Sequence, residues 1–272
     1  MKFPVDVQHL RGPAGSLAVH VCGPSQGQAV LMAHSILAAS MMWAEQAQQL
    51  AALGYRVVAM DTRGHGQSAS APPPYRMQDL VADTLAVMDG LGIAQAHYIG
   101  LSLGGMSGFG LASEHGNRLL SAILCDCRAD MPSEMGAVWN ERMSLARSQG
   151  CGVLAQPTLE RWFGTAFLAQ HPEVQQAFGP TLAHTSADGF IGCAQAIQGL
   201  DYLGQVDRIT VPVTLIVGAN DGPMPKAMAH LQTHIAGSQL VVIPNAGHLP
   251  NIDQPEAFNR AMLAHFAACA RP

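Results

Sequence analysis

Gly100-Leu101-Ser102-Leu103-Gly104 is the stretch that decides the predicted fold. It follows an apolar run, Ala96 to Ile99, that indicates a strand, and it leads into a helical pattern from Met106 to Ala112. A serine on so sharp a strand-to-helix turn has a strained backbone, and bulky residues two positions before or after it would collide. Glycine at positions 100 and 104 avoids that collision. The stretch therefore predicts a nucleophilic serine, Ser102, although a glycine-rich turn with an incidental serine is the alternative.

Short apolar runs recur along the chain and alternate with helical patterns. Their Val, Ile and Leu content without strict alternation is typical of strands buried on both faces of a parallel sheet. Roughly the first twenty residues predict a hairpin that turns between Arg11 and Ser16, and a helix is expected from Met77 to Met88, ending at Gly90. The fold class is thus α/β, with a mostly parallel central sheet flanked by helices. The predicted strands span residues 29–33, 56–60, 96–99, 122–125, 213–217 and 240–243.

One stretch, residues 128–204, interrupts this alternation. It is mostly helical in pattern, contains two of the three tryptophans and has no convincing strand. An insertion at this point would cover the carboxyl ends of the strands, where open α/β sheets bind their ligands. We expect residues 128–204 to form a helical lid, or cap, and residues 1–127 and 205–272 to form the core.

A serine nucleophile needs a general base, which is usually histidine, and an acid that orients that histidine. His248 has the best setting, because Gly247 allows a tight loop just after the last predicted strand. Asp221 follows the strand before it. The resulting chain order, Ser102, Asp221, His248, is the order expected for a nucleophile on a strand-to-helix turn. Asp126, after the strand that ends at residue 125, is the alternative acid.

Catalysis by an activated serine also needs donors for the oxyanion that forms on the substrate carbonyl. One donor is expected to be the backbone N–H of Leu103, the residue after the nucleophile. The other is expected from the loop His34-Ser35-Ile36-Leu37 after the first parallel strand, and we place it on Ile36.

With these pieces placed, the chain resembles the α/β-hydrolase family along nearly its whole length, and within it the 3-oxoadipate enol-lactonases and their esterase relatives. The resemblance implies that Ser102, Asp221 and His248 form the catalytic triad, that Ile36 and Leu103 are the oxyanion donors, and that Trp139 belongs to the substrate pocket. The segments that carry the likeness are Tyr55 to Ser68, Gly100 to Met106, Trp139 to Arg142, Leu159 to Phe163 and Gly247 to Phe258.

Two departures from the family pattern lie in segments that are expected to select the substrate. The loop after the first parallel strand commonly has glycine where this chain has Leu37. The run from Cys125 to Asp130 replaces the small, neutral residues expected at the entrance to the lid.

The lid carries candidate substrate contacts. Met106, Trp139 and Trp162 could line an apolar pocket, although packing between lid helices would explain the two tryptophans equally well. Arginine is the residue best suited to bind a substrate carboxylate. The candidate arginines are Arg128, Arg142 and Arg161, and the alternative is that each is a surface residue paired with Glu141 or Glu160.

Composition limits the other function classes. The 14 Lys and Arg residues are scattered and the net charge is −5, which argues against a nucleic-acid partner. No run of about 18 apolar residues predicts a membrane span, and Met1 to Asp6 shows no signal-peptide pattern. The six cysteines lack metal-finger spacing and are most simply reduced, which makes the cytoplasm the default location. His230 and His234 are expected to be a surface pair, and no metal site is predicted.

The sequence therefore predicts an enzyme that hydrolyses a small carboxylic ester or lactone through a Ser-His-Asp triad and an acyl-enzyme, without a cofactor. Hydrolysis of a carbon–carbon bond in a diketone or ring-fission product is an alternative, because it would use the same triad. A ligand receptor on the same fold, without catalysis, is a second alternative. A homodimer is left open.

Overall fold

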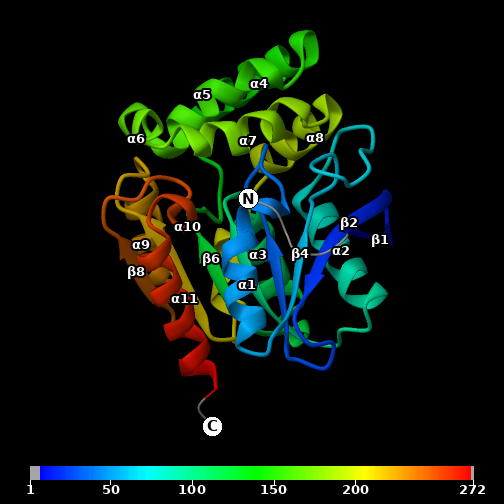
Figure 1. The fold of residues 1–272 in the computed structure, drawn as a ribbon, viewed down its shortest axis with the longest axis vertical. Coiled ribbons are helices and arrows are strands. Elements are labelled where there is room, and N and C mark those ends of the chain that lie inside the picture. The colour runs from blue at the N-terminus through cyan, green and yellow to red at the C-terminus, as the bar shows by residue number, and fades with distance from the viewer. Residues whose placement is uncertain (1–6, 271–272) are drawn as a thin grey trace.

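The computed structural model describes residues 7–270, so the expectation about Met1 to Asp6 lies outside the described residues. Its centre is an eight-stranded sheet in the order β1-β2-β4-β3-β5-β6-β7-β8 (Figure 1). β1 pairs with β2, and β2 with β4, in antiparallel fashion, and every other neighbouring pair is parallel. The predicted mostly parallel sheet and the hairpin are therefore confirmed. The strands are β1 (Val7–Gly12), β2 (Gly15–Cys22), β3 (Ala29–Ala33), β4 (Arg56–Met60), β5 (Ala96–Leu101), β6 (Leu119–Cys125), β7 (Val213–Gly218) and β8 (Gln239–Ile243).

Helices cover both faces of this sheet (Figure 1). α1 and α11 are tied together by a hydrogen bond of 2.9 Å from the Gln46 side chain to Asn259, and α2 packs against α3. These core helices are α1 (Ala44–Ala52), α2 (Met77–Gly90), α3 (Leu103–Glu114), α9 (Met224–Gln232), α10 (Pro250–Asp253) and α11 (Pro255–Cys269). Short 3-10 helices lie at Ser40–Trp43, Gly116–Arg118, Ser133–Met135 and Leu203–Arg208.

The five helices between β6 and β7 form a separate layer across one end of the sheet (Figure 1). They are α4 (Gly136–Gln149), α5 (Gly152–Phe163), α6 (Thr165–Gln170), α7 (Pro172–His184) and α8 (Ala187–Gln198). Two backbone hydrogen bonds fasten this layer to loops at the carboxyl ends of strands. The N–H of Ser186 donates to Gly64 after β4 at 3.1 Å, and the N–H of His248 after β8 donates to Trp162 at 2.8 Å. The layer therefore lies over the edge where a parallel sheet presents its ligand site.

The parallel strands are buried as their composition predicts. Every residue of β3, β5 and β7 is buried, which explains why these strands lack alternating polar residues. The structure extends several predicted boundaries. β6 begins at Leu119, because buried Ser121 interrupts the apolar run without ending the strand, and α3 begins at Leu103 instead of Met106.

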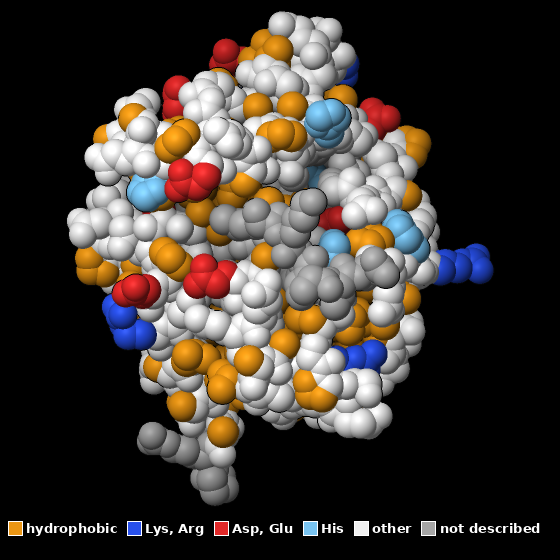
Figure 2. Space-filling model, in the orientation of Figure 1, with side chains coloured by type: hydrophobic (Ala, Val, Ile, Leu, Met, Phe, Trp, Pro, Cys, Tyr) orange, Lys and Arg blue, Asp and Glu red, His pale blue; other side chains and the backbone are white. Residues whose placement is uncertain are grey.

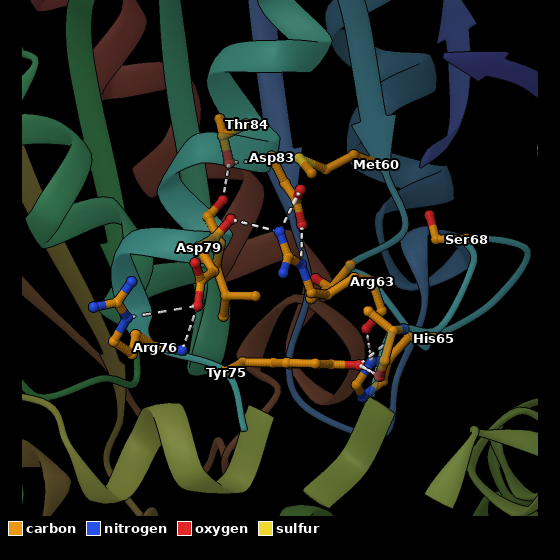
Figure 3. Close-up of polar contacts among 12 residues, drawn as sticks. Met60, Arg63, His65, Ser68, Tyr75, Arg76, Asp79, Asp83 and Thr84 are labelled. Carbon is orange, nitrogen blue, oxygen red and sulfur yellow. Dashed lines mark hydrogen bonds and ion pairs between the residues drawn. The ribbon is translucent and has the colours of Figure 1, made fainter. Parts of the chain in front are cut away.

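The loop after β4 is fixed by a buried ion pair (Figure 3). The guanidinium of Arg63 binds both carboxylate oxygens of Asp83 on α2, at 2.6 and 2.7 Å, and donates to the backbone oxygen of Asp79 at 3.0 Å. The ring of Tyr75 lies 5.3 Å below the same guanidinium. This bidentate pair anchors the loop that receives the N-terminus of α8, so its effect reaches the helical layer.

The surface agrees with the low charge of the sequence. On the face shown in Figure 2, Lys and Arg side chains are few and lie apart from one another. Among residues 7–270, no helix is both long and apolar enough to cross a membrane.

Candidate active site

Ser102 lies at the junction of β5 and α3, in a strained conformation. Its φ of 55° and ψ of −113° are unusual for a residue with a side chain. A Cβ on Gly100 would collide with the backbone of Gly104, and a Cβ on Gly104 would collide with the carbonyl of Ala33. The collision predicted from the sequence is thus confirmed, and both glycines are required by the turn.

Asp221 and His248 meet on the loops after β7 and β8. The Nδ1 atom of His248 lies 2.7 Å from Oδ2 of Asp221, and both side chains are buried. Burial lowers the pKa of His248 below its ordinary value, and the negative charge of Asp221 opposes that effect. The ring is therefore neutral at pH 7, with its proton on the nitrogen that donates to Asp221.

The sheet brings these residues to one edge. Ser102 follows β5, Asp221 follows β7 and His248 follows β8. β6 lies between them and links the loops, because its Cys125 carbonyl accepts the N–H of Ser102 at 2.9 Å. The N–H of the next residue, Asp126, donates to Ile216 of β7 at 2.9 Å. Parallel strands with aligned carboxyl ends thus place a serine, a neutral imidazole and its acid on one surface.

The loop after β3 is held by His34. Nε2 of His34 accepts the N–H of Thr62 at 2.8 Å, so the proton of this ring is on Nδ1, which lies 2.8 Å from the carbonyl oxygen of Ser35. Burial also lowers the pKa of His34, which keeps the ring neutral. In a trans peptide the carbonyl and the following N–H point in opposite directions. Fixing the Ser35 carbonyl therefore fixes the direction of the Ile36 N–H.

Leu37, where the resembled family commonly has glycine, adopts a φ of 68°. A left-handed conformation costs a residue with a side chain about 1–2 kcal/mol, which explains the family's preference. The Leu37 side chain is completely buried, and its packing offsets that cost.

Comparison with known proteins fits this geometry. The family described as alpha/beta hydrolase fold matches residues 28–255. The chain belongs to this family. The predicted resemblance and fold are therefore confirmed for this α/β hydrolase, as is the prediction of an enzyme, a hydrolase.

Named relatives of this α/β hydrolase are similar to it over almost its whole length. 3-oxoadipate enol-lactonase 2 of Acinetobacter baylyi is 35% identical over 89% of this chain and 90% of its own length. The structure of the enol-lactonase from Burkholderia xenovorans LB400 superposes with a TM-score of 0.91 at 30% identity, covering 96% of this chain and all (100%) of that one. A thermophilic esterase from Thermogutta terrifontis, with malate bound, has a TM-score of 0.90 at 27% identity, covering 98% of this chain and 100% of that chain.

The aromatic candidates of the α/β hydrolase lie close to His248 or to Arg142. The ring of Trp162 stacks 6.4 Å from that of His248, and Trp162 also contacts Phe163 and Phe178, so it both faces His248 and packs the helical layer. Trp139 is 9% exposed and its Nε1 is buried without a hydrogen-bond partner among the described residues. Met106, one turn into α3, is buried as well, and its N–H donates to the carbonyl of Ser102 at 2.8 Å.

The three candidate arginines of the α/β hydrolase have different surroundings. Arg142 lies over the rings of Trp139 and Phe190, at 5.1 and 5.6 Å, and donates to the Thr158 hydroxyl at 2.9 Å. No carboxylate pairs with it among the described residues, and burial together with Arg161 lowers its pKa to about 10.

Neither of the other two arginines pairs with Glu141 or Glu160. Arg161 is half-exposed, and its guanidinium lies 3.8 Å from Oδ1 of Asp221, so it faces the acid that holds His248. Arg128 pairs with Asp130 at 3.2 Å and is not brought to His248. Among these three arginines, only Arg142 forms no ion pair with a carboxylate of the described residues.

Several supporting residues of the α/β hydrolase were not found from the sequence. Asp253 accepts the N–H of Gly247 at 2.6 Å, and burial raises its pKa to about 7. In the sequence, the only feature that points to Asp253 is that an acidic residue follows shortly after Gly247 and His248. His34 carries a signal that could have been used, since it directly follows a buried strand and precedes the proposed donor Ile36.

His97, the pair His230 and His234, and the cysteines have the surroundings that the sequence predicts. His97 lies inside β5 and burial lowers its pKa to about 4. His230 and His234 are an exposed pair with ring centroids 4.5 Å apart. The six cysteines are free. Within the described part of the chain, the one group with metal-ligand geometry is Asp126, Asp221 and His248.

One cavity of the described residues is not lined by Ser102. It has a volume of about 480 Å³ and is lined by loop residues after β3 and β4, including Ser40, Asp61 and Gln67, together with Thr181 and His184 of α7. Ser102 itself is only 5% exposed.

Proposed function

We propose that this α/β hydrolase cleaves a carboxylic ester or lactone through an acyl-enzyme on Ser102. Its named relatives include enol-lactonases and an esterase. The observation that carries the proposal is the buried Asp221–His248 hydrogen bond of 2.7 Å, at the same sheet edge as a serine in a strained strand-to-helix turn.

His248 acts first as a base. With its Nδ1 proton donated to Asp221, the other ring nitrogen takes the Ser102 proton as Oγ attacks the substrate carbonyl. The tetrahedral oxyanion accepts hydrogen bonds from the N–H groups of Ile36 and Leu103, and each such donor is typically worth about 3 kcal/mol of barrier. The first N–H of α3 belongs to Leu103, so the helix N-terminus adds favourable charge.

His248 then acts as an acid. It gives the proton to the leaving alkoxide oxygen, the carbonyl re-forms, and the ester bond to Ser102 is left. Water, deprotonated by the same ring, attacks this acyl-enzyme, and the proton returns to Ser102 Oγ as the carboxylic acid departs. Bonds and protons balance over the cycle, with water as the only co-substrate.

The proposed substrate carries a carboxylate that Arg142 binds. A partly buried guanidinium with one hydroxyl partner and no carboxylate has unused donors, and the buried Nε1–H of Trp139 beside it is a further unused donor. The malate in the Thermogutta terrifontis esterase shows that a dicarboxylate binds that relative. Met106 and Trp162 supply apolar walls, and Arg128 takes no part because Asp130 neutralises it.

The proposal includes the chain's organisation. Residues 128–204 act as the cap that selects substrate, and residues 1–127 and 205–272 act as the core that performs the reaction. The partner is a small molecule, neither nucleic acid nor membrane. We assign the cytoplasm as the location and leave a homodimer as the assembly to be tested by light scattering.

A substrate panel tests the reaction. A carboxylate-bearing lactone, p-nitrophenyl esters of graded acyl length and a vinylogous diketone would be offered to the wild type and to Ser102→Ala. The proposal expects lactone and ester turnover that Ser102→Ala loses by at least a thousandfold. Turnover of the diketone alone would replace it with carbon–carbon hydrolysis. Ligand-induced thermal stabilisation without any product would replace it with a receptor.

A further inference from the structure

Asp126 is the first residue after β6, and the reaction proposed above does not use it. It is completely buried and has a φ of 45°, a left-handed conformation that side chains rarely adopt. Its Oδ1 accepts the N–H of Gly218 at 2.9 Å, three residues before Asp221. Its Oδ2 is buried with no donor among the described residues. Asp126 thus combines a strained backbone with a buried carboxyl oxygen, Oδ2, that no described donor reaches.

The Asp126 carboxyl group lies beside Asp221, the acid of the proposed triad. One oxygen of Asp126, one of Asp221 and one ring nitrogen of His248 all lie within 4.8 Å of one another. His248 hydrogen-bonds Asp221 at 2.7 Å, so Asp126 lies behind the acid and does not replace it. Two carboxylate oxygens this close repel each other if both are ionised, and a single proton between them turns repulsion into a strong hydrogen bond.

The charges around Asp126 do not favour its ionised form. No cation forms an ion pair with Asp126 among the described residues, and the half-exposed Arg161 lies 3.8 Å from Asp221 instead. Burial raises the pKa of Asp126 well above its usual value, and the charge of Asp221 raises it further, opposed by the Gly218 N–H. The other titratable groups that face it are acidic, except His248: Cys125, Cys127, Asp221 and Asp253.

We propose that Asp126 is a positioning residue that stays a neutral carboxylic acid and donates its proton to the Asp221 carboxylate. This hydrogen bond holds Asp221 in the orientation that receives His248 Nδ1–H. It also draws part of the Asp221 charge away from the imidazole, so the protonated ring gains less stabilisation and His248 remains a base at lower pH. The role rests on the proposed function, because it concerns the same triad.

The test compares two substitutions. Asp126→Asn keeps an acceptor for Gly218 and places an amide N–H where the carboxyl proton was, and asparagine also tolerates the positive φ. Asp126→Ala removes both. The acidic limb of kcat/KM reports the protonation of the free enzyme's base. The Asn variant is expected to keep kcat/KM within about threefold and the wild-type acidic limb. The Ala variant is expected to lose kcat tenfold or more with little change in KM, and its acidic limb is expected to move to higher pH.

Three results would overturn the proposal. If Asp126→Asn lost as much kcat as Asp126→Ala, or shifted its acidic limb by half a pH unit, a charged carboxylate would be needed. If Asp126→Ala kept the wild-type kcat and limb, the residue would have no influence on the triad. Activity that EDTA abolishes and a divalent metal restores would equally contradict it, by making the three residues metal ligands.

A measurement that does not depend on turnover distinguishes failure of this proposal from failure of the proposed ester hydrolysis. Titration of His248 followed by NMR is expected to give the same pKa in the wild type and Asp126→Asn, and a higher one in an Asp126→Ala protein that folds. If the enzyme turned over no ester but this pattern held, the proposed function would fail and the role of Asp126 would stand. If Asp126→Ala did not fold, the Asn variant alone would decide, because a shifted His248 titration contradicts the shared proton.

Discussion

A guanidinium that lies over two aromatic rings marks the proposed substrate end of the site. Arg142 has Trp139 and Phe190 on its faces and a single hydroxyl partner, so its charge is not neutralised by the protein. Hydrogen bonds to a charged group are worth about 1.5–3 kcal/mol, or roughly ten- to a hundredfold in binding. Arg142→Met is therefore expected to lower kcat/KM at least tenfold for an ester that carries a carboxylate, and little for a neutral ester of equal length.

Arg128→Met is the matched control for that change, since Arg128 is already paired with Asp130. Steady-state kinetics with the two esters would give the preference for the charged one in each variant. The Arg128 variant is expected to keep the wild-type preference. An equal loss on both esters in Arg142→Met would show that Arg142 packs the helices and does not bind a carboxylate.

The contact between α8 and the loop after β4 requires glycine on both sides. The backbones of Gly64 and Gly189 touch, and a Cβ on Gly189 would collide with Gly64. Gly189→Ala is therefore expected to displace α8 from the loop after β4, to lower the unfolding temperature by several degrees and to reduce kcat/KM. Thermal unfolding and turnover measure the two effects.

Gly179→Ala is the control, because Gly179 lies within α7 and a Cβ there meets nothing. Alanine is better than glycine in an open helix position by about 0.5–1 kcal/mol, so this variant is expected to be slightly stabilised. If both alanine variants behaved alike, the contact between Gly64 and Gly189 would not hold the helical layer.

At the scale of the whole molecule, buried histidines make stability depend on pH. Burial lowers the pKa of His65 to about 3 and the pKa values of His97 and His265 to about 4. Between pH 6.5 and about 4 the unfolded chain binds protons that the folded chain does not, so stability falls as pH falls. Each histidine contributes up to about 1.4 kcal/mol per pH unit there. Asp253, with its pKa raised to about 7, and Asp126, whose pKa burial raises well above its usual value, act in the opposite direction, since both favour the folded state at low pH.

The three histidines outnumber these two carboxyl groups and set the sign, so the unfolding temperature is expected to drop from pH 7 to pH 5. His97→Gln is expected to reduce by about one the number of protons bound on unfolding near pH 5. Calorimetry across this pH range measures both. An unfolding temperature that is the same at pH 5 and pH 7 would contradict the neutral state of these buried rings.

The features that the sequence could predict have local causes. Ser102 is recognisable because its strained turn excludes side chains at Gly100 and Gly104, and the order of Asp221 and His248 follows from the order of the strands. The contact of Arg142 with Trp139 joins residues three apart on α4, which is a spacing that helices bring together. The contact of Arg142 with Phe190 could not be predicted, because it joins α4 to α8, about 50 residues away, and no spacing rule relates them. The hydrogen bond of Asp126 to Gly218 depends in the same way on which strands are neighbours in the sheet.

The central claim is that Ser102 becomes acylated with His248 as its base, and covalent trapping tests it most directly. The folded enzyme would be treated with a fluorophosphonate, and the adduct counted by intact-mass spectrometry and located by peptide mapping, for the wild type, Ser102→Ala and His248→Gln. The account predicts one adduct per chain on Ser102, none in Ser102→Ala, and labelling slowed by at least a hundredfold in His248→Gln. Ester turnover by an enzyme whose Ser102 stays unlabelled, or by Ser102→Ala at the wild-type rate, would contradict it.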